Sequence, residues 1–286
     1  MEAPRAHPLL GFYGPESMMW RINREAVLLG AGPTALLLQI AHPSVARGVA
    51  EHSNFEADPF RRLHGTIHTT MALVFGDGRQ AERAVRRLNG IHARIRGDDY
   101  RALDPALLLW VQVTLIVTSV RAYELWVRRL EPPEKEQFWQ EARRVGVRLG
   151  ITLAQSPADW AALQAYWANM LAADGPIQVS DTAQRLAPLI VRPPLPLVPR
   201  PLVDLLALPG LALVPARLRD AFGIGWSPAH ERLASLIGLA IRLWVRLVPA
   251  PLRSLPHANA AWRRAGGNRS SSYARWTDTI RGFVTR

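Results

Sequence analysis

The stretch that decides the fold is residues 58–97, DPFRRLHGTIHTTMALVFGDGRQAERAVRRLNGIHARIRG. Asp58-Pro59 predicts the start of a helix, because aspartate accepts bonds from free backbone amides and proline suits the first helical position. Gly76-Asp77-Gly78 predicts a turn, and the apolar spacing after it predicts a second helix over about 79–96. Two helices joined by a short turn indicate an all-α protein.

The same signals recur outside this stretch. Asp104-Pro105 predicts a long helix that runs to about Leu130, and Glu131-Pro132-Pro133 ends it. The chain contains no alternating apolar and polar run of useful length and no Asn-Gly hairpin. We therefore expect one all-α domain of about ten or more helices.

The domain boundaries follow from composition. We expect an N-terminal extension over residues 1–24, the helical domain over 25–264 and a polar tail over 265–286. Residues 188–215 are rich in proline but also in leucine and valine, whereas an interdomain linker is polar. This segment is predicted to cross over the body of the domain in short, packed helices.

Charge and cysteine content exclude several classes of function. The net charge is +12, but the 35 basic residues include only one lysine and are spread along the chain. Nucleic-acid binding is therefore not expected, because it requires a clustered basic patch. The chain has no cysteine, which excludes disulfides, iron–sulfur clusters and thiolate-ligated haem. A metal or haem must be held by His, Asp, Glu, Tyr or Met.

The apolar segments are not those of a spanning protein. Residues 1–8 show no apolar core of a secretory signal, and residues 107–118 are shorter than the roughly 20 residues that a bilayer requires. The apolar run over 236–249 is interrupted by Arg242 and Arg246. We expect a cytoplasmic protein whose arginine-studded apolar stretches can contact a membrane surface.

Two motifs have alternative interpretations. Gly30–Ala35 matches the spacing of a dinucleotide-binding fingerprint, with Glu51 about 20 residues later, but the surrounding strand pattern is missing, which favours a glycine turn between helices. His64 and His68 share a helix face, which suits zinc, but the glutamate of the metalloprotease motif is missing. A zinc hydrolase remains one alternative.

The most informative residue is His92. It lies on an apolar stripe formed by Ala81, Ala84, Val85, Leu88, Ile91 and Ile95, so we expect it to point inward. Arg96 follows one helical turn later. A buried histidine is more often a core residue with one hydrogen bond, but an inward arginine beside it suits haem, whose iron binds imidazole and whose propionates pair with guanidinium.

A second pair lies on the preceding helix. Arg62 and Thr66 are four residues apart and therefore share a face. They could supply another propionate contact and a hydroxyl near the haem, or they could be an exposed arginine and a helix-interior threonine. The sequence predicts non-covalent haem b, with His92 as the iron ligand, and leaves the role of this pair open.

These residues belong to a set of blocks that resembles one family. The blocks are Leu36–Pro43, Gly48–Phe55, Pro59–Leu63, Phe75–Asp77, Ile91–Gly97, Asp104-Pro105, Leu109–Val111, Thr114-Leu115, Leu213–Pro215, Leu218-Arg219 and Gly223–Trp226. Together they resemble the latex-clearing rubber oxygenases and the MpaB-type oxygenases over roughly residues 25 to 250.

The resemblance implies an all-α fold around b-type haem and oxygen-dependent cleavage of isoprenoid carbon–carbon double bonds. It makes His92 similar to the proximal iron ligand. Arg62, Thr66 and Arg96 match positions that line the haem, and Thr114 is a weaker match.

The chain departs from the family pattern in three ways. Rubber-cleaving members carry a lysine where this chain has Gly65, and they are exported, whereas this chain shows no signal. Many relatives carry histidine in place of Gln112. Rubber is therefore not the expected substrate.

The resulting expectation is a haem b-dependent oxygenase that acts with O2 on an apolar, lipid-like molecule by oxidative C=C cleavage. Thr66 and Glu51 are the candidate catalytic residues, with Glu51 as the candidate base. A non-catalytic haem-binding or sensing protein is the other alternative.

Overall fold

The computed structural model describes residues 7–52, 59–193 and 198–266, with only the backbone described for residues 59–64. These residues form fourteen α-helices and two short 3-10 helices, and the only β-type pairings among them are isolated bridges. The predicted all-α fold class is confirmed. The glycine motif at residues 30–32 lies at the junction of a 3-10 helix and an α-helix. No described strand precedes it, so it is a turn between helices rather than a dinucleotide-binding loop.

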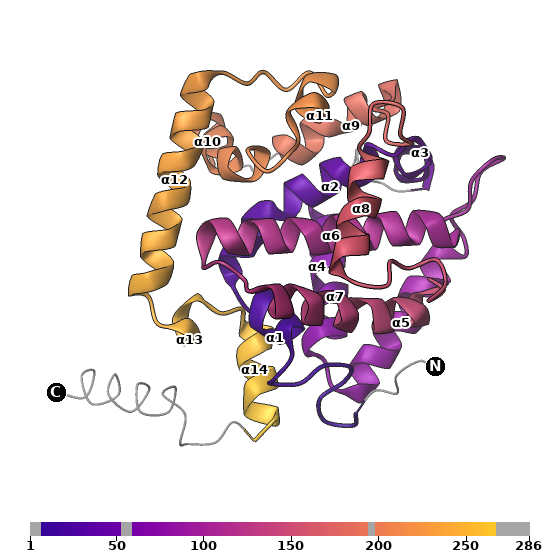
Figure 1. Cartoon of the computed structure of the whole chain (residues 1–286), viewed down its shortest axis with the longest axis vertical. Helices are drawn as coiled ribbons and strands as arrows, with labels where there is room; N and C mark the ends of the chain where they lie inside the picture. The colour runs from indigo at the N-terminus through magenta and orange to yellow at the C-terminus, as the bar shows by residue number, and fades with distance from the viewer. Residues whose placement is uncertain (1–6, 53–58, 194–197, 267–286) are drawn as a thin grey trace.

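Figure 1 shows the arrangement of the helices, with α6 across the middle. Their bounds are α1 Met18–Asn23, η1 Ala26–Ala31, α2 Gly32–Ile40, α3 Pro43–His52, α4 Pro59–Phe75, α5 Gly78–His92, α6 Pro105–Trp126, α7 Pro132–Gly146, η2 Val147–Leu149, α8 Trp160–Met170, α9 Asp181–Val191, α10 Arg200–Leu211, α11 Ala216–Ala221, α12 Pro228–Leu247, α13 Ala250–Arg253 and α14 Pro256–Arg264.

The centre of the core is α6. It begins at the predicted place, with the Asp104 carboxylate accepting from the Ala106 amide at 2.8 Å. More than one side of α6 is apolar and buried, so α1, α2, α7, α12 and η1 all pack against it. Trp110 is fully buried, stacks on Trp167 at 5.5 Å between ring centroids, and donates its indole N–H to the Leu38 carbonyl at 3.2 Å.

Length and hydropathy alone would allow α6 to cross a membrane. Among the described residues, α6 is the only single helix that is long and apolar enough for this. The bent pair of η1–α2 and α3 would be a second candidate only if the pair counted as one span. However, 61% of the most apolar window of α6 is buried inside the fold. This burial is what a core helix shows.

The predicted hairpin of α4 and α5 is confirmed at its turn. Asp77 caps α5 through a reciprocal pair of bonds with Gln80, each close to 2.9 Å. Gly76 is required here, because a Cβ atom would collide with the Ala72 carbonyl. The helix was expected to reach residue 96, but it ends at His92.

The early end of α5 has a physical cause in the segment that follows. Residues 93–104 fold back on themselves, with the Ala102 amide bonded to the Ile95 carbonyl at 2.9 Å and the Gly97 amide to the Tyr100 carbonyl at 3.0 Å. Tyr100 is buried by this reversal. Long-range packing of a tyrosine therefore overrides the helical pattern of residues 93–96.

The packed body begins before residue 25. Met18, Trp20 and Ile22 of α1 are buried in the main core, and Trp20 donates its indole N–H to the Val74 carbonyl at 2.7 Å. The proline-rich segment forms short helices, as predicted, and Leu208, Leu211 and Val214 are buried against the body.

We predict that Trp110→Ala lowers the free energy of unfolding by about 3–5 kcal/mol, because it leaves a cavity and an unpaired Leu38 carbonyl. Leu115→Ala on the same helix is the control, since Leu115 is 40% exposed, and it should cost about 0.5 kcal/mol or less. Urea denaturation measures both. Equal losses for the two variants would contradict the central burial of Trp110.

Candidate functional site

His92 is the last residue of α5 and is partly buried. Because α4 and α5 run antiparallel from a two-residue turn, each rising about 1.5 Å per residue, His92 lies at about the level of Arg62 on α4. The two residues therefore occupy the open end of the hairpin. The side chain of Arg62 lies outside the described part of the structure.

The segment that follows His92 is fastened to the end of α3. The Tyr100 hydroxyl donates to the Glu51 carboxylate at 2.6 Å, and the His52 Nε2 lies 3.1 Å from the Arg96 carbonyl. Arg47 pairs with Asp99 at 2.8 Å, although this pair is exposed and contributes little. The end of α3 thus fixes the course of the chain immediately beyond the candidate ligand.

Burial and hydrogen bonding act together on Tyr100. Burial, and then the hydrogen bond to Glu51, together raise the pKa of its phenol to about 12. The phenol is consequently a hydrogen-bond donor at neutral pH. The Glu51 carboxylate is half exposed and accepts this bond through one oxygen, so its other oxygen stays available to accept a proton from a substrate.

The structure corrects the position of Arg96. It was expected one helical turn beyond His92 on an inward face, but it lies outside α5 and is exposed. Ile91, which was placed on the same stripe, is 45% exposed. The buried part of the stripe is therefore its first half, around Ala81, Ala84 and Val85.

The two candidate threonines do not come together. Thr66 is exposed on α4, whereas Thr114 is fully buried in α6, where its hydroxyl donates to the Val111 carbonyl at 2.7 Å. The hydroxyl of Thr114 is satisfied within its own helix. Of the two, only Thr66 belongs to the hairpin that carries His92.

Gly65 leaves open space on α4. Among the described residues, a Cβ atom at this position would meet no heavy atom within 4 Å outside the helix's own backbone. No described element therefore packs closely enough on Gly65 to explain a glycine within this helix. A helical glycine costs about 1 kcal/mol relative to alanine, and no contact of Gly65 offsets this cost.

The side chains available as metal ligands suit haem better than zinc. A haem supplies four nitrogen ligands of its own and needs only one or two from the protein, whereas zinc needs three or four. No group of three His, Asp or Glu side chains among the described residues could hold a metal ion. His68 is exposed with its ring edge-on to His257, 6.3 Å between centroids, and no described third ligand joins them.

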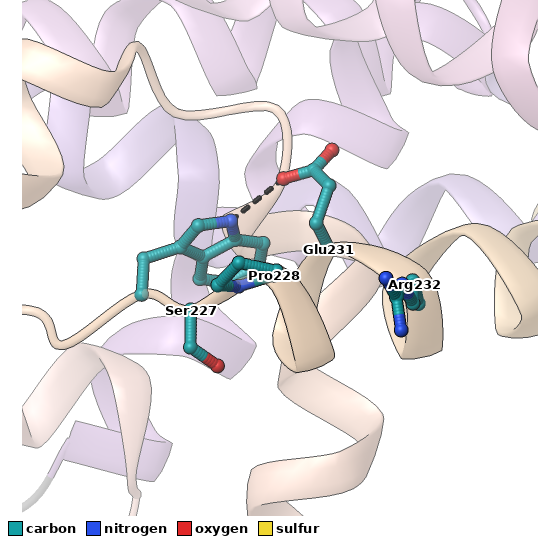
Figure 2. Close-up of a pocket in the computed structure, with 5 residues that line it drawn as sticks. Ser227, Pro228, Glu231 and Arg232 are labelled. Carbon is teal, nitrogen blue, oxygen red and sulfur yellow. Dashed lines mark hydrogen bonds between the residues drawn. The ribbon is translucent and has the colours of Figure 1, made fainter.

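Two surface pockets lie away from His92. One, of about 500 Å³, is lined by Trp226, Ser227, Pro228, Glu231 and Arg232 at the start of α12 (Figure 2). Trp226 donates its indole N–H to Glu231 there at 2.6 Å. The other, of about 350 Å³, lies between residues 12–17 and α7. Neither is lined by a candidate catalytic or haem-binding residue, although Trp226 ends one of the family blocks.

Tyr100 is the site residue that sequence reasoning missed. Its one signal is the run of turn-forming residues before it, Gly97-Asp98-Asp99, which argues against a helix through this region. Its partner Glu51 lies 49 positions away, and no local pattern links them.

Comparison with known proteins identifies the family. The family described as "ER-bound oxygenase mpaB/B'/Rubber oxygenase, catalytic domain" matches residues 19–250 of this chain. Similar proteins include an uncharacterized protein of Mycobacterium bovis and one of Mycobacterium tuberculosis, each 29% identical over 229 residues that cover 75% of this chain and 87% of the relative. No solved structure is significantly similar to this chain. The chain therefore belongs to the mpaB/rubber oxygenase catalytic-domain family.

Proposed function

We propose that this protein is a haem b-dependent oxygenase that cleaves a carbon–carbon double bond of an apolar substrate. The single observation that supports this most is the placement of His92, partly buried at the open end of the α4–α5 hairpin, in a chain of an oxygenase family. Bound haem would supply the oxygen chemistry.

The residues of the chain have separate tasks in this proposal. The His92 imidazole holds the iron, Arg62 and Arg96 pair with the propionates, and the Thr66 hydroxyl lies near the reacting face. Glu51 and Tyr100 hold the segment that follows His92 and so position the ligand. Glu51 is also the candidate base, through the carboxylate oxygen that does not accept from Tyr100.

The substrate class follows from charge and space. The described α4 and α5 present Gly65 where rubber-cleaving relatives carry a lysine, so this side of the site lacks that ammonium group. An apolar molecule, with isoprenoids as the class that the family suggests, is the substrate that we propose for a site without this lysine. We do not expect rubber to be the substrate.

We predict that the purified protein binds one non-covalent haem b and that His92→Ala abolishes the Soret band and the oxygen uptake seen with isoprenoid substrates. His68→Ala is the matched control and should retain both, because His68 is exposed on the neighbouring helix. Absorbance, acid–acetone extraction and an oxygen electrode measure these properties. A His92→Ala protein with the wild-type spectrum would refute the ligand assignment.

Because Arg96 is exposed, its substitution should have only a small effect on haem affinity. A pair between an exposed arginine and a propionate contributes about 1 kcal/mol or less, so Arg96→Ala should raise the haem dissociation constant about twofold to fivefold. Arg94→Ala removes an exposed arginine two residues away and should have no effect. Haem transfer to apo-globin measures both; equal transfer rates would remove Arg96 from the site.

Gly65→Lys tests the open side of α4. The variant should fold and gain about 0.5–1 kcal/mol of helix stability, because no described neighbour opposes a Cβ atom at this position. It should also shift the haem spectrum and slow carbon monoxide binding. Gly90→Lys on α5, where a Cβ atom is equally unopposed and the residue is exposed, should give the same stability gain with an unchanged spectrum.

Two results would contradict this prediction. Unfolding of Gly65→Lys but not of Gly90→Lys would restore close packing as the reason for the glycine. Identical spectra and ligand-binding rates in the two variants would place residue 65 away from the haem.

A further inference from the structure

The outer face of α12 is apolar, whereas a helix face that is exposed to water is usually polar. Leu236, Leu239, Leu243 and Leu247 are 62%, 64%, 54% and 72% exposed, and their spacing of three and four residues places them on one face. Ala234, Gly238 and Val245 form the buried face, which packs against α6 and α10. The leucines therefore point away from the protein.

Neighbouring elements extend this apolar surface. Leu206 on α10, which packs beside α12, is 61% exposed, and Leu252 on α13 is 64% exposed. Trp244 is 44% exposed on α12 itself. Several large exposed apolar side chains on neighbouring elements are typical of an interaction site. Figure 1 shows α12 along one edge of the molecule, where nothing in the described structure covers its outer side.

Arginines accompany the leucines and outnumber the carboxylates of the helix. On the wheel of α12, Arg242 and Arg246 lie along one side of the leucine face, and Arg232 lies within it, one turn before Leu236. None of the three forms an ion pair with a described residue. Glu231 is the one carboxylate on α12 and accepts the Trp226 indole N–H, while Asp204 on α10 pairs with Arg192, each at 2.6 Å.

These charges distinguish between two candidate partners for the leucine face of α12, a second copy of the chain and a lipid surface. The spacing of Leu233, Leu236, Ala240, Leu243 and Leu247 would also suit a pair of helices from two copies of the chain. A second copy, however, brings the same excess of three arginines over one carboxylate, so the two helices would repel each other along this flank. An anionic lipid surface supplies both the apolar layer and the negative charge.

We propose that the outer face of α12, continued by α10 and α13, rests on an anionic membrane surface, with the leucines in the headgroup boundary and the arginines on lipid phosphates. The helix lies along the surface rather than across it, because its other face is packed against α6 and α10. The net charge of +12 favours attraction to an anionic surface. The proposal does not depend on haem.

Vesicle co-sedimentation tests this directly. The full chain should bind vesicles of phosphatidylcholine with phosphatidylserine, and bind vesicles of pure phosphatidylcholine far less. The double variant Leu236→Gln/Leu243→Gln should bind at least about tenfold more weakly, since two exposed leucines lose their burial in lipid. Leu9→Gln/Leu103→Gln removes two leucines that are exposed elsewhere and should bind as the wild type does.

The arginines provide a second measurement. Arg232→Gln/Arg246→Gln should weaken binding to the anionic vesicles about twentyfold to thirtyfold, at about fivefold per arginine, and should leave binding to pure phosphatidylcholine unchanged. Circular dichroism checks that each variant keeps its helices, as substitutions of exposed residues should allow.

Several outcomes would overturn the proposal. One is failure to bind anionic vesicles, or binding that the α12 variants do not change. Another is a dimer in light scattering that Leu236→Gln/Leu243→Gln converts to monomers, which would identify a second copy as the occupant. A third is binding that appears only when the chain is cut after Gly266, which would show that residues 267–286 cover the face.

Discussion

The structure depends on the burial of α6. This helix is apolar around most of its circumference, so it is stable only when other helices surround it. The chain covers it with elements drawn from both ends, including α1, α2, α7 and α12. Buried tryptophans pack between these helices. Trp20 and Trp110 each donate an indole N–H to a backbone carbonyl, so the burial of these two side chains leaves neither indole N–H unpaired.

The candidate site is built at the edge of this core. The α4–α5 hairpin delivers His92, and the end of α3 restrains the chain that follows it. Because Tyr100 is buried and bonded to Glu51, the reversal after His92 has one defined course. Residues close in the sequence to His92 are thereby separated from it, with Arg96 exposed on the loop rather than aligned on the helix.

The same residue types have different consequences in α6 and α12. Both helices are rich in leucine and valine, but α6 is enclosed, whereas α12 buries only its small residues and turns its leucines outward. Gly238 lies on the buried face of α12, where a Cβ atom would be in ordinary contact, at 3.8 Å, with the indole of Trp126. Both helices carry many large apolar side chains, and the packing partner decides whether those side chains form core or exposed surface.

The sequence by itself determined the all-α class, the α4–α5 hairpin, the start of α6 and the family blocks, because caps, turns and helical spacing act over a few residues. It also singled out His92 and Gly65. It could not place Arg96, Thr114 or Tyr100. The end of α5 depends on Tyr100, whose partner Glu51 is 49 residues away, and the exposure of the α12 leucines depends on which face meets α6. Contacts between residues distant in the chain decided these features, and a local pattern contains no record of them.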